Sequence, residues 1–415
     1  PRPRRVLLVT PAGSYRTNAY LQAAQTLGLD VVVASEGEHS VVPAYSRGIK
    51  VRFADIDQTL SLIFEEAQRS PFSGVVATDD YASEVAAQIA QRLDLPHNDP
   101  HAVRIARRKD LARQRLLQHG MRCPRFWRID LNHSLADQID AVTYPCVAKP
   151  IALSASRGVI RADTPQQLLK ACDRIRSILR EVENPEENHC ILVEEFIPGS
   201  ECAVEGLLHE GSLEILAIFD KPDDMQGPYF EETYYVTPSR MSQKTQEIIR
   251  VLLQKACIAY GLHQGPIHGE CRVNERGVWV LELAARTIGG ECARVFGYGT
   301  NVGLEQLVLA NATGCRLPMT PKLDIAAGVL MIPVPKGGVL RRVEGVSAAQ
   351  RVVNVEEVII TVREGYVLTP WPEGTSYLGF IFARAETPEH VETALRTAHA
   401  HLNIVVAPMF NVSVA

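Results

Sequence analysis

The sequence has few of the features that mark specialised classes of protein. Its nine cysteines occur singly from Cys123 to Cys315, without CxxC pairs or metal-finger spacing, so we expect reduced thiols rather than a disulfide framework. No stretch approaches the ~20 apolar residues of a membrane helix. The apolar run Val6–Val9 is too short for a secretory signal. These absences predict a soluble, cytoplasmic protein.

An excess of charge of one sign is also missing. The 43 lysines and arginines nearly balance the 48 aspartates and glutamates, for a net charge of −5, and no long block of like charge occurs. We therefore expect neither a nucleic-acid nor a membrane partner. The 415 residues leave room for roughly two to four domains with sizeable cores.

The first hundred residues predict a parallel, doubly wound sheet. Apolar strands alternate with helical segments, and the strands lie at residues 6–10, 31–34, near 51 and at 75–78. The turn after the first strand contains only Gly13, so neither GxGxxG nor GxxxxGK[ST] is present and a nucleotide site of those kinds is not expected here. The turns at Ser14 and at Asp79-Asp80 follow strand ends, where such sheets meet their substrates.

Two lysines stand out in the next hundred residues. A helical pattern runs from Val103 to Gly120 with Lys109 in its middle, where a surface lysine is ordinary. A short apolar strand, by contrast, ends on Lys149, and a desolvated ammonium is costly unless an anion answers it. The small residues at 151–159 that follow form either a loop that closes over phosphates or a plain hairpin loop.

The segment Pro266–Gly290 predicts a β-hairpin with two facing carboxylates. If residues 275–277 form a three-residue loop with its glycine in the left-handed conformation, Glu270 lies opposite Glu282. Such residues have Cβ atoms ~4.5–5.5 Å apart and like charges repel there unless a cation lies between them. Carboxylates without His or Cys favour a hard ion such as Mg²⁺. The alternative is a solvated hairpin with incidental charges.

Arg286 follows this hairpin beside Gly289-Gly290, where a guanidinium and closely approaching backbone suit an anionic reacting group. Two more segments are open to two interpretations. The first, Glu194–Ile197 with Glu201 after the turn, fits either an adenine and its ribose or a polar hairpin. The second, residues 219–240, is a turn-rich stretch that is either a substrate loop or merely solvated; its candidates are Asp220, Lys221, Glu231 and Glu232.

Residues 320–415 predict a last α+β unit without chemistry of its own. Its strands are expected near 328–332, 358–362 and 379–385, and a helix at 388–402. The glycines and prolines between them are typical of turns.

In their order and spacing, several of these residues resemble the ATP-grasp superfamily over about residues 100–315. The matching set is Lys109, Lys149 with its loop, Glu194-Glu195, Glu201, Glu270, Glu282 and Arg286. The resemblance implies a Rossmann-like N-terminal parallel-sheet domain (1–100), an ATP-grasp small, lid subdomain (101–190), a large catalytic subdomain (191–318) and a small C-terminal α+β domain (319–415).

The resemblance also implies roles for the residues. ATP would contact Lys109, Lys149, Ser154, Ser156, Arg157, Gly158, Glu194, Glu195, Phe196, Ile197 and Glu201. Glu270 and Glu282 would bind one or two Mg²⁺ ions, with Mn²⁺ as a substitute. Arg286 would steady an acyl phosphate and tetrahedral intermediate, with Lys149 and Glu282 also catalytic. Ala284 stands where many members have Asn, which leaves a second Mg²⁺ with one fewer ligand.

The Glu-Leu-Ala-Ala-Arg sequence, together with FDKP, FEET and VTPSR, resembles bacterial L-amino acid ligases and the ligase half of carnosine synthases. This implies an ADP-forming carboxylate-amine ligase that joins amino acids through an acyl phosphate. Substrate contacts would fall on Glu232, His268, Arg286, Gly289 and Gly290. Two alternatives are an ATP-grasp enzyme that phosphorylates an enol or a non-amino-acid carboxylate, and a nucleotide-binding regulator without turnover. A homodimer is left open.

Overall fold

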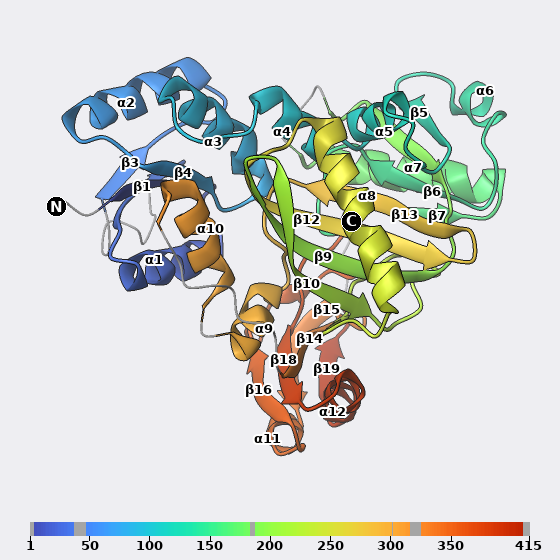
Figure 1. The fold of residues 1–415 in the computed structure, drawn as a ribbon. Coiled ribbons are helices and arrows are strands. Elements are labelled where there is room, and N and C mark those ends of the chain that lie inside the picture. Colours follow the sequence, from blue (N-terminus) through green and yellow to red (C-terminus); the bar gives the residue numbers. More distant parts are fainter. Residues whose placement is uncertain (1–3, 37–46, 183–186, 301, 316–324, 410–415) are drawn as a thin grey trace, which may run out of the picture.

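The computed structural model describes residues 4–36, 47–182, 187–300, 302–315 and 325–409. Figure 1 shows an N-terminal domain, a small sheet on the opposite side, and a long central sheet that continues into the tapered end of the molecule. Among the described residues, no helix is both long and apolar enough to cross a membrane.

The N-terminal domain is a four-stranded parallel sheet in the order β3-β2-β1-β4, which confirms the predicted doubly wound fold. Its elements are β1 (Arg5–Thr10), α1 (Thr17–Thr26), β2 (Asp30–Ser35), β3 (Arg47–Lys50), α2 (Ile56–Arg69), β4 (Gly74–Ala77) and α3 (Asp80–Arg92). Alternate residues of β1 enter two cores: Leu7 and Val9 pack on the α2 and α3 side, and Val6 and Leu8 on the other. The second core also contains residues of α10 (Leu304–Thr313), a helix that returns from much later in the chain.

The helix predicted from 103 to 120 is in fact two helices, α4 (Pro100–Arg107) and α5 (Lys109–Gln118). Arg108 between them is extended, with φ −98° and ψ 105°, and its guanidinium donates to both carboxylate oxygens of Asp110 at 3.0 and 2.8 Å. The spacing of apolar residues continues across the single extended residue Arg108, so hydrophobic periodicity did not reveal that the helix is broken there. Lys109 consequently opens α5, and its backbone N–H donates to Ile151 at 2.9 Å.

The small sheet is antiparallel, in the order β5-β8-β6-β7. Its elements are β5 (Phe126–Asp130), α6 (Leu135–Ile139), β6 (Cys146–Pro150), β7 (Ile160–Ala162), α7 (Pro165–Leu179) and β8 (Cys190–Glu195). On β6, Cys146 and Ala148 pack into the core beneath α7. Since side chains alternate along a strand, Val147 and Lys149 face the opposite way, toward the centre of the molecule.

The central sheet has eight strands in the order β13-β12-β9-β10-β11-β14-β18-β16. The strands are β9 (Ser200–His209), β10 (Ser212–Lys221), β11 (Tyr234–Thr237), β12 (Gly265–Asn274), β13 (Gly277–Ala284), β14 (Ala326–Ile332), β16 (Val355–Ile360) and β18 (Gly379–Ala385). The sheet therefore runs across the domain boundary predicted at 318/319, and the predicted domain limits stay predictions.

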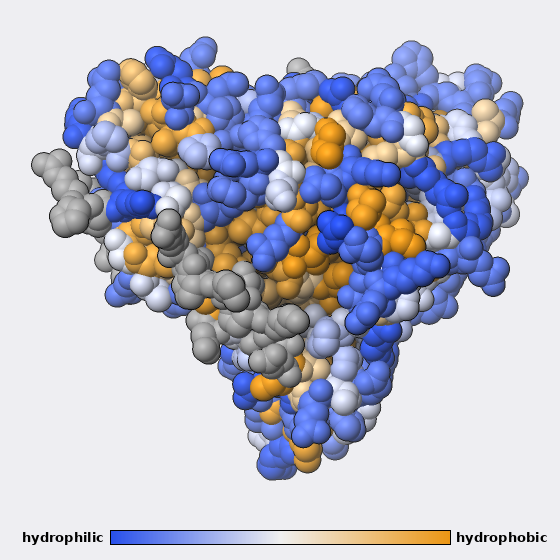
Figure 2. Space-filling view, in the orientation of Figure 1, coloured by the Kyte–Doolittle hydropathy of each residue, from blue (hydrophilic) through white to orange (hydrophobic). Residues whose placement is uncertain are grey.

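Helices and a minor sheet cover this central sheet. The helices are α8 (Gln243–Tyr260), α9 (Cys292–Gly299), α11 (Val346–Gln350) and α12 (Pro388–Ala400), and β15 (Gly338–Glu344), β17 (Val367–Leu368) and β19 (Asn403–Ala407) form the minor sheet. Figure 2 shows one face of the molecule, with hydrophilic side chains around its rim and hydrophobic ones nearer its centre, close to α8. Ile248, Val251 and Ile258 of α8 are exposed.

The hairpin β12–β13 has a shorter turn than predicted, yet it keeps the predicted facing pair. Asn274 pairs with Gly277, so the turn holds two residues rather than three. A register shift on the other side of Cys271 leaves Leu281 as an extra residue, and beyond it Glu270 pairs with Glu282. The carbonyl of Leu281 accepts from Arg113 Nη2 at 2.5 Å. The error in the turn is thus cancelled by a bulge.

Candidate active site

A cavity of about 700 Å³ lies where the N-terminal loops, the small sheet, the central sheet and a C-terminal loop meet. This volume is within the range of small-molecule sites, ~300–1,000 Å³. Most of the predicted site residues line it: Lys109, Lys149, Ser154, Ser156, Glu194, Glu195, Phe196, Ile197, Glu201, Glu232, His268, Glu270, Glu282, Arg286, Gly289 and Gly290. The roles assigned to these residues stay predictions.

Arg157 and Gly158, which were predicted to contact phosphates, do not line this cavity. Arg157 turns outward, where its Nη2 donates to Glu181 at 2.6 Å, and the backbone N–H of Gly158 donates to the Pro372 carbonyl at 3.0 Å. Ser14 is also absent from the lining, although its neighbours Tyr15 and Arg16 are present. The cause in each case is the loop backbone, whose direction the sequence does not reveal.

The two lysines of the cavity already have partners. Lys109 Nζ donates to the Leu153 carbonyl at 2.7 Å and lies 3.7 Å from Glu282 Oε2. Lys149 donates to Glu194, which also accepts from Arg113 Nε at 2.6 Å. Burial alone would raise the pKa of Glu194, but Arg113 and Lys149 hold it down at about 2. The Glu194 carboxylate is therefore ionised and fixes Lys149 in place.

The predicted adenine segment forms the apolar end of the cavity. Phe196 packs with Val147, Met225 and Phe230, and the Phe196 and Phe230 ring centroids are 6.3 Å apart. The backbone N–H of Phe196 donates to Pro145 at 3.0 Å, so it is not available to a base. Such an apolar wall suits a flat, largely apolar group.

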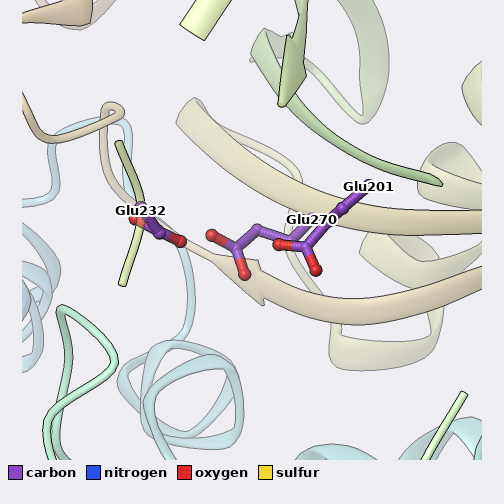
Figure 3. A group of neighbouring side chains, drawn as sticks. All are labelled: Glu201, Glu232 and Glu270. Atoms are coloured by element: carbon purple, nitrogen blue, oxygen red, sulfur yellow. The ribbon is translucent and has the colours of Figure 1, made fainter. Parts of the chain in front are cut away.

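Three carboxylates of the cavity surround a buried lysine. Lys221 Nζ lies 2.7 Å from Glu201, 2.7 Å from Glu232 and 3.1 Å from Glu270. Figure 3 shows Glu232 pointing at the other two from a separate segment. The carboxylate oxygens lie within 4.8 Å of one another, close enough to share a metal ion. Glu201, predicted at the ribose, thus belongs to a charged cluster that the sequence did not bring together.

Burial and charge act in opposite directions within this cluster. Burial raises the pKa of Glu232, whereas at Glu270 burial is outweighed by Lys221, which holds the pKa well below its ordinary value. His268 Nε2 lies 3.5 Å from Glu270, and burial lowers the pKa of His268. Glu232 also accepts from the Tyr235 hydroxyl at 2.6 Å.

Arg286 is held by the N-terminal domain. Its Nε donates to Asp80 Oδ2 at 2.6 Å, and its Nη1 donates to the Thr287 carbonyl at 2.9 Å. The prediction that the Asp79-Asp80 turn faces the substrate region agrees with this placement, because both residues line the cavity. Gly290 has φ +63°, and a Cβ there would lie 2.3 Å from Met331 Sδ, so this position favours glycine.

The C-terminal part of the chain contributes lining residues to the cavity, and the expectation that it has no chemistry of its own stays a prediction. Thr375, Ser376, Tyr377 and Phe380 line the cavity. Their loop follows no periodic pattern, so hydrophobic periodicity could not predict its place at the cavity. Arg272 was missed although a signal existed, because it lies two residues from Glu270 on the same face of β12 and donates to Glu201 at 2.9 Å.

Comparison with known families agrees with this geometry. Residues 142–295 match the family model of the ATP-grasp domain, residues 21–97 that of the ATP-grasp N-terminal domain, and residues 330–407 that of L-amino acid ligase C-terminal domain 2. The chain is therefore a protein of the ATP-grasp superfamily, as the order of its residues predicted. Within that superfamily its C-terminal residues resemble those of L-amino acid ligases.

Individual relatives point in the same direction. The crystal structure of L-amino acid ligase from Bacillus licheniformis matches with a TM-score of 0.84 and 27% identity, covering 98% of this chain and 100% of that one. Carnosine synthase 1 of Gallus gallus is 27% identical over 372 residues, 83% of this chain and 39% of that protein. Alanine–anticapsin ligase of Bacillus subtilis (strain 168) is 21% identical over 249 residues, 56% of this chain and 52% of that protein. The chain thus matches about half or less of these two curated relatives.

Proposed function

We propose that this protein is an ADP-forming carboxylate-amine ligase that joins amino acids. The observation that carries the proposal is the convergence in one cavity of two lysines, the opposed pair Glu270 and Glu282, and Arg286. Phosphoryl transfer needs such groups, because its catalysis consists mostly of positioning and of stabilising spread negative charge. The relatives named as amino acid ligases support the choice of substrate.

We place ATP with its base at the apolar end of the cavity and its phosphates toward the lysines. The base would lie against Phe196 and Val147, with Glu201 near the ribose. Lys109 and Lys149 would then contact the phosphates. Their ammonium groups are held by Leu153 and Glu194, so little side-chain entropy remains to be lost when the nucleotide binds.

The donor set fits Mg²⁺. Glu270 and Glu282 are paired across the hairpin, both line the cavity, and both offer oxygen ligands, which a hard cation prefers. When bound, the ion would neutralise charge on the transferred phosphoryl group. The number of bound ions, one or two, is not assigned. Ala284 offers no side-chain ligand, so a second ion would have one ligand fewer.

In the proposed reaction, the carboxylate of one amino acid attacks the γ-phosphorus of ATP, and ADP leaves. The neutral amine of a second amino acid then attacks the acyl carbon, the carbon–oxygen bond to phosphate breaks, the nitrogen gives up a proton to the departing phosphate, and an amide forms. Arg286 would stabilise the oxygen that becomes negative during the second step. The three carboxyl groups of Glu201, Glu232 and Glu270 surround the single ammonium group of Lys221. This excess of acidic groups favours binding of the ammonium group of the first amino acid.

The test is phosphate release from ATP with pairs of amino acids, together with ¹⁸O labelling of the carboxylate. We expect ADP as product and ¹⁸O in the released phosphate. Glu282→Gln should lower kcat by about a hundredfold or more, because electrostatic contacts to the transition state are worth ~2.7–4 kcal/mol. Glu275→Gln, in the exposed turn of the same hairpin, should have no effect. Formation of AMP, or turnover with an enol but no amino acid, would contradict the proposal.

A further inference from the structure

Arg16 brings a third guanidinium into the cavity, besides those of Arg272 and Arg286, and its hydrogen bonds go to neutral groups. Its Nη1 donates to the Thr287 hydroxyl at 3.0 Å, to the Thr287 carbonyl at 3.1 Å and to the Thr78 carbonyl at 3.3 Å. Its Nε donates to the Tyr15 hydroxyl at 3.2 Å. Within the part of the chain that the structure describes, no carboxylate forms an ion pair with Arg16, and no acceptor is bound by its Nη2.

Arg286 and Arg16 differ in the partners of their guanidinium groups. Arg286 lines the same cavity, but its Nε forms an ion pair with Asp80 Oδ2 at 2.6 Å. Among the described residues, the Nη2 of Arg16 has no hydrogen-bond acceptor, so this side of the guanidinium is open to an anion in the cavity. Arg is the side chain best suited to a carboxylate.

The free side of Arg16 faces the proposed reaction centre. A Cβ placed on Gly289 would lie 3.4 Å from Arg16 Nη2, so this nitrogen lies over the backbone of the Gly289-Gly290 turn. Thr287, which anchors Nη1, is the residue directly after Arg286. Arg16 therefore lies beside the residue proposed to hold the acyl group while the amine attacks.

The position of Arg16 also separates it from the acidic cluster. Glu232 and Glu270, with Lys221 between them, form the part of the cavity that suits an ammonium. The carboxylate of the first amino acid becomes part of an acyl phosphate, whose charge lies on the phosphate that later leaves, whereas the second amino acid keeps a free carboxylate close to its attacking nitrogen. That second carboxylate is an anion of the proposed reaction that still needs a cation.

We propose that Arg16 binds the free carboxylate of the amine-donating amino acid and thereby makes the protein select amino acids over simple amines. The inference rests on the proposed ligase function and adds the recognition of the second substrate to it. Thr78 and Thr287 act as positioning residues, because they fix the guanidinium from the N-terminal domain and from the end of the β12–β13 hairpin.

The experiment compares an amine-donating amino acid with its own carboxamide, which keeps the amine and removes the charge. In the wild-type protein the free acid should have the lower KM. Arg16→Gln should raise the KM for the acid by about ten- to a hundredfold, the usual range for a lost charged hydrogen bond, and leave the KM for the carboxamide and for the carboxylate-donating amino acid unchanged. Arg16→Lys should restore part of the preference.

Two controls keep the outcomes distinct. Arg69→Gln, on an exposed part of α2, should change neither KM. Activity of Arg16→Gln with the carboxamide shows that the variant is folded. If Arg16→Gln does not fold, the wild-type comparison decides, since equal use of acid and carboxamide overturns the proposal. Equal loss with both substrates in Arg16→Gln also overturns it. No phosphate release with any pair would instead refute the ligase function itself.

Discussion

At the scale of single residues, several charged groups around the cavity form ion pairs with one another. Lys149 is held by Glu194, Lys109 lies near Glu282, and Lys221 joins Glu270 to two other carboxylates. The side chains that we propose to contact phosphates and a cation are thus held in place by other groups of the protein. Preorganised charge of this kind is the main source of electrostatic catalysis, because no reorganisation is needed during the reaction.

Glu205 differs from these paired groups, because it is buried and forms no ion pair with a lysine or arginine among the described residues. Its Oε2 accepts from the Ile288 backbone N–H at 2.9 Å, and His268 Nδ1 lies 3.8 Å away. Burial raises the pKa of Glu205 well above its ordinary value, and the Ile288 hydrogen bond lowers it only in part. The folded protein therefore keeps a proton that the unfolded chain releases. The stability that this proton contributes is complete below the unfolded pKa and is lost as pH rises toward the folded pKa.

This predicts a pH-dependent effect of Glu205→Gln, which stays neutral and keeps an oxygen for Ile288. Each pH unit in which only the unfolded chain has lost the proton weakens the wild-type fold by about 1.4 kcal/mol. Thermal melting should show that, as pH rises above the ordinary pKa of a glutamate, about 4.3, Tm falls less in the variant than in the wild-type protein. Parallel profiles for the two proteins would show that Glu205 is ionised in the fold. Glu275→Gln serves as the exposed control.

At the scale of elements, the loop that was predicted to cover phosphates is held from outside by the C-terminal loop around Trp371. Ala155 and Ser156 have φ of 56° and 53°, a left-handed conformation that costs non-glycine residues ~1–3 kcal/mol each. The indole Nε1 of Trp371 donates to the Ala155 carbonyl at 3.3 Å, and the Pro372 carbonyl accepts from Gly158. The two loops therefore stabilise each other.

We expect Trp371→Phe, which keeps a ring and removes the indole donor, to loosen this loop. The KM for ATP should rise by about three- to tenfold, the range for one lost hydrogen bond, with a matching loss of ADP affinity in calorimetry. The matched control is Trp279→Phe, because Trp279 is equally buried and its indole N–H has no partner among the described residues. Equal effects of the two substitutions would show that ring size, and not the hydrogen bond, matters.

The elements also show what sequence reasoning can reach. Strands of the N-terminal sheet were predicted correctly because continuous apolar runs between turns have few other interpretations. The break at Arg108 was missed, since one extended residue does not disturb apolar spacing. The pairing of Glu270 with Glu282 was predicted correctly although the length of the turn was predicted wrongly, because the bulge at Leu281 restores the expected register. Such local departures depend on tertiary contacts, here the bond from Arg113 to Leu281.

At the scale of the whole molecule, the cavity is built by contacts between distant parts of the chain. Arg16 bonds to Thr287, and Trp371 bonds to Ala155. Neither contact leaves a trace in local periodicity, so the residues that resemble a known family could be predicted while Arg16 and the C-terminal loop could not. The central sheet links these parts, since the hairpin β12–β13 lies at one edge and the C-terminal strands β14, β18 and β16 lie toward the other.

The ion pair between Asp80 and Arg286 joins the N-terminal domain to the end of β13, and we expect it to be needed for turnover. Asp80→Asn keeps the size of the side chain and removes its charge, so Arg286 loses the partner that orients it. A displacement of about 1 Å in a positioned group can cost roughly a hundredfold in rate. The measured kcat for phosphate release should therefore fall by about that factor, while circular dichroism and ADP binding stay as in the wild-type protein. Asp57→Asn, on the exposed first turn of α2, is the matched control and should keep full activity. If kcat of Asp80→Asn stayed within about twofold of wild type, Arg286 would not depend on the N-terminal domain for its position, and that domain would serve the site through its other cavity-lining residues alone.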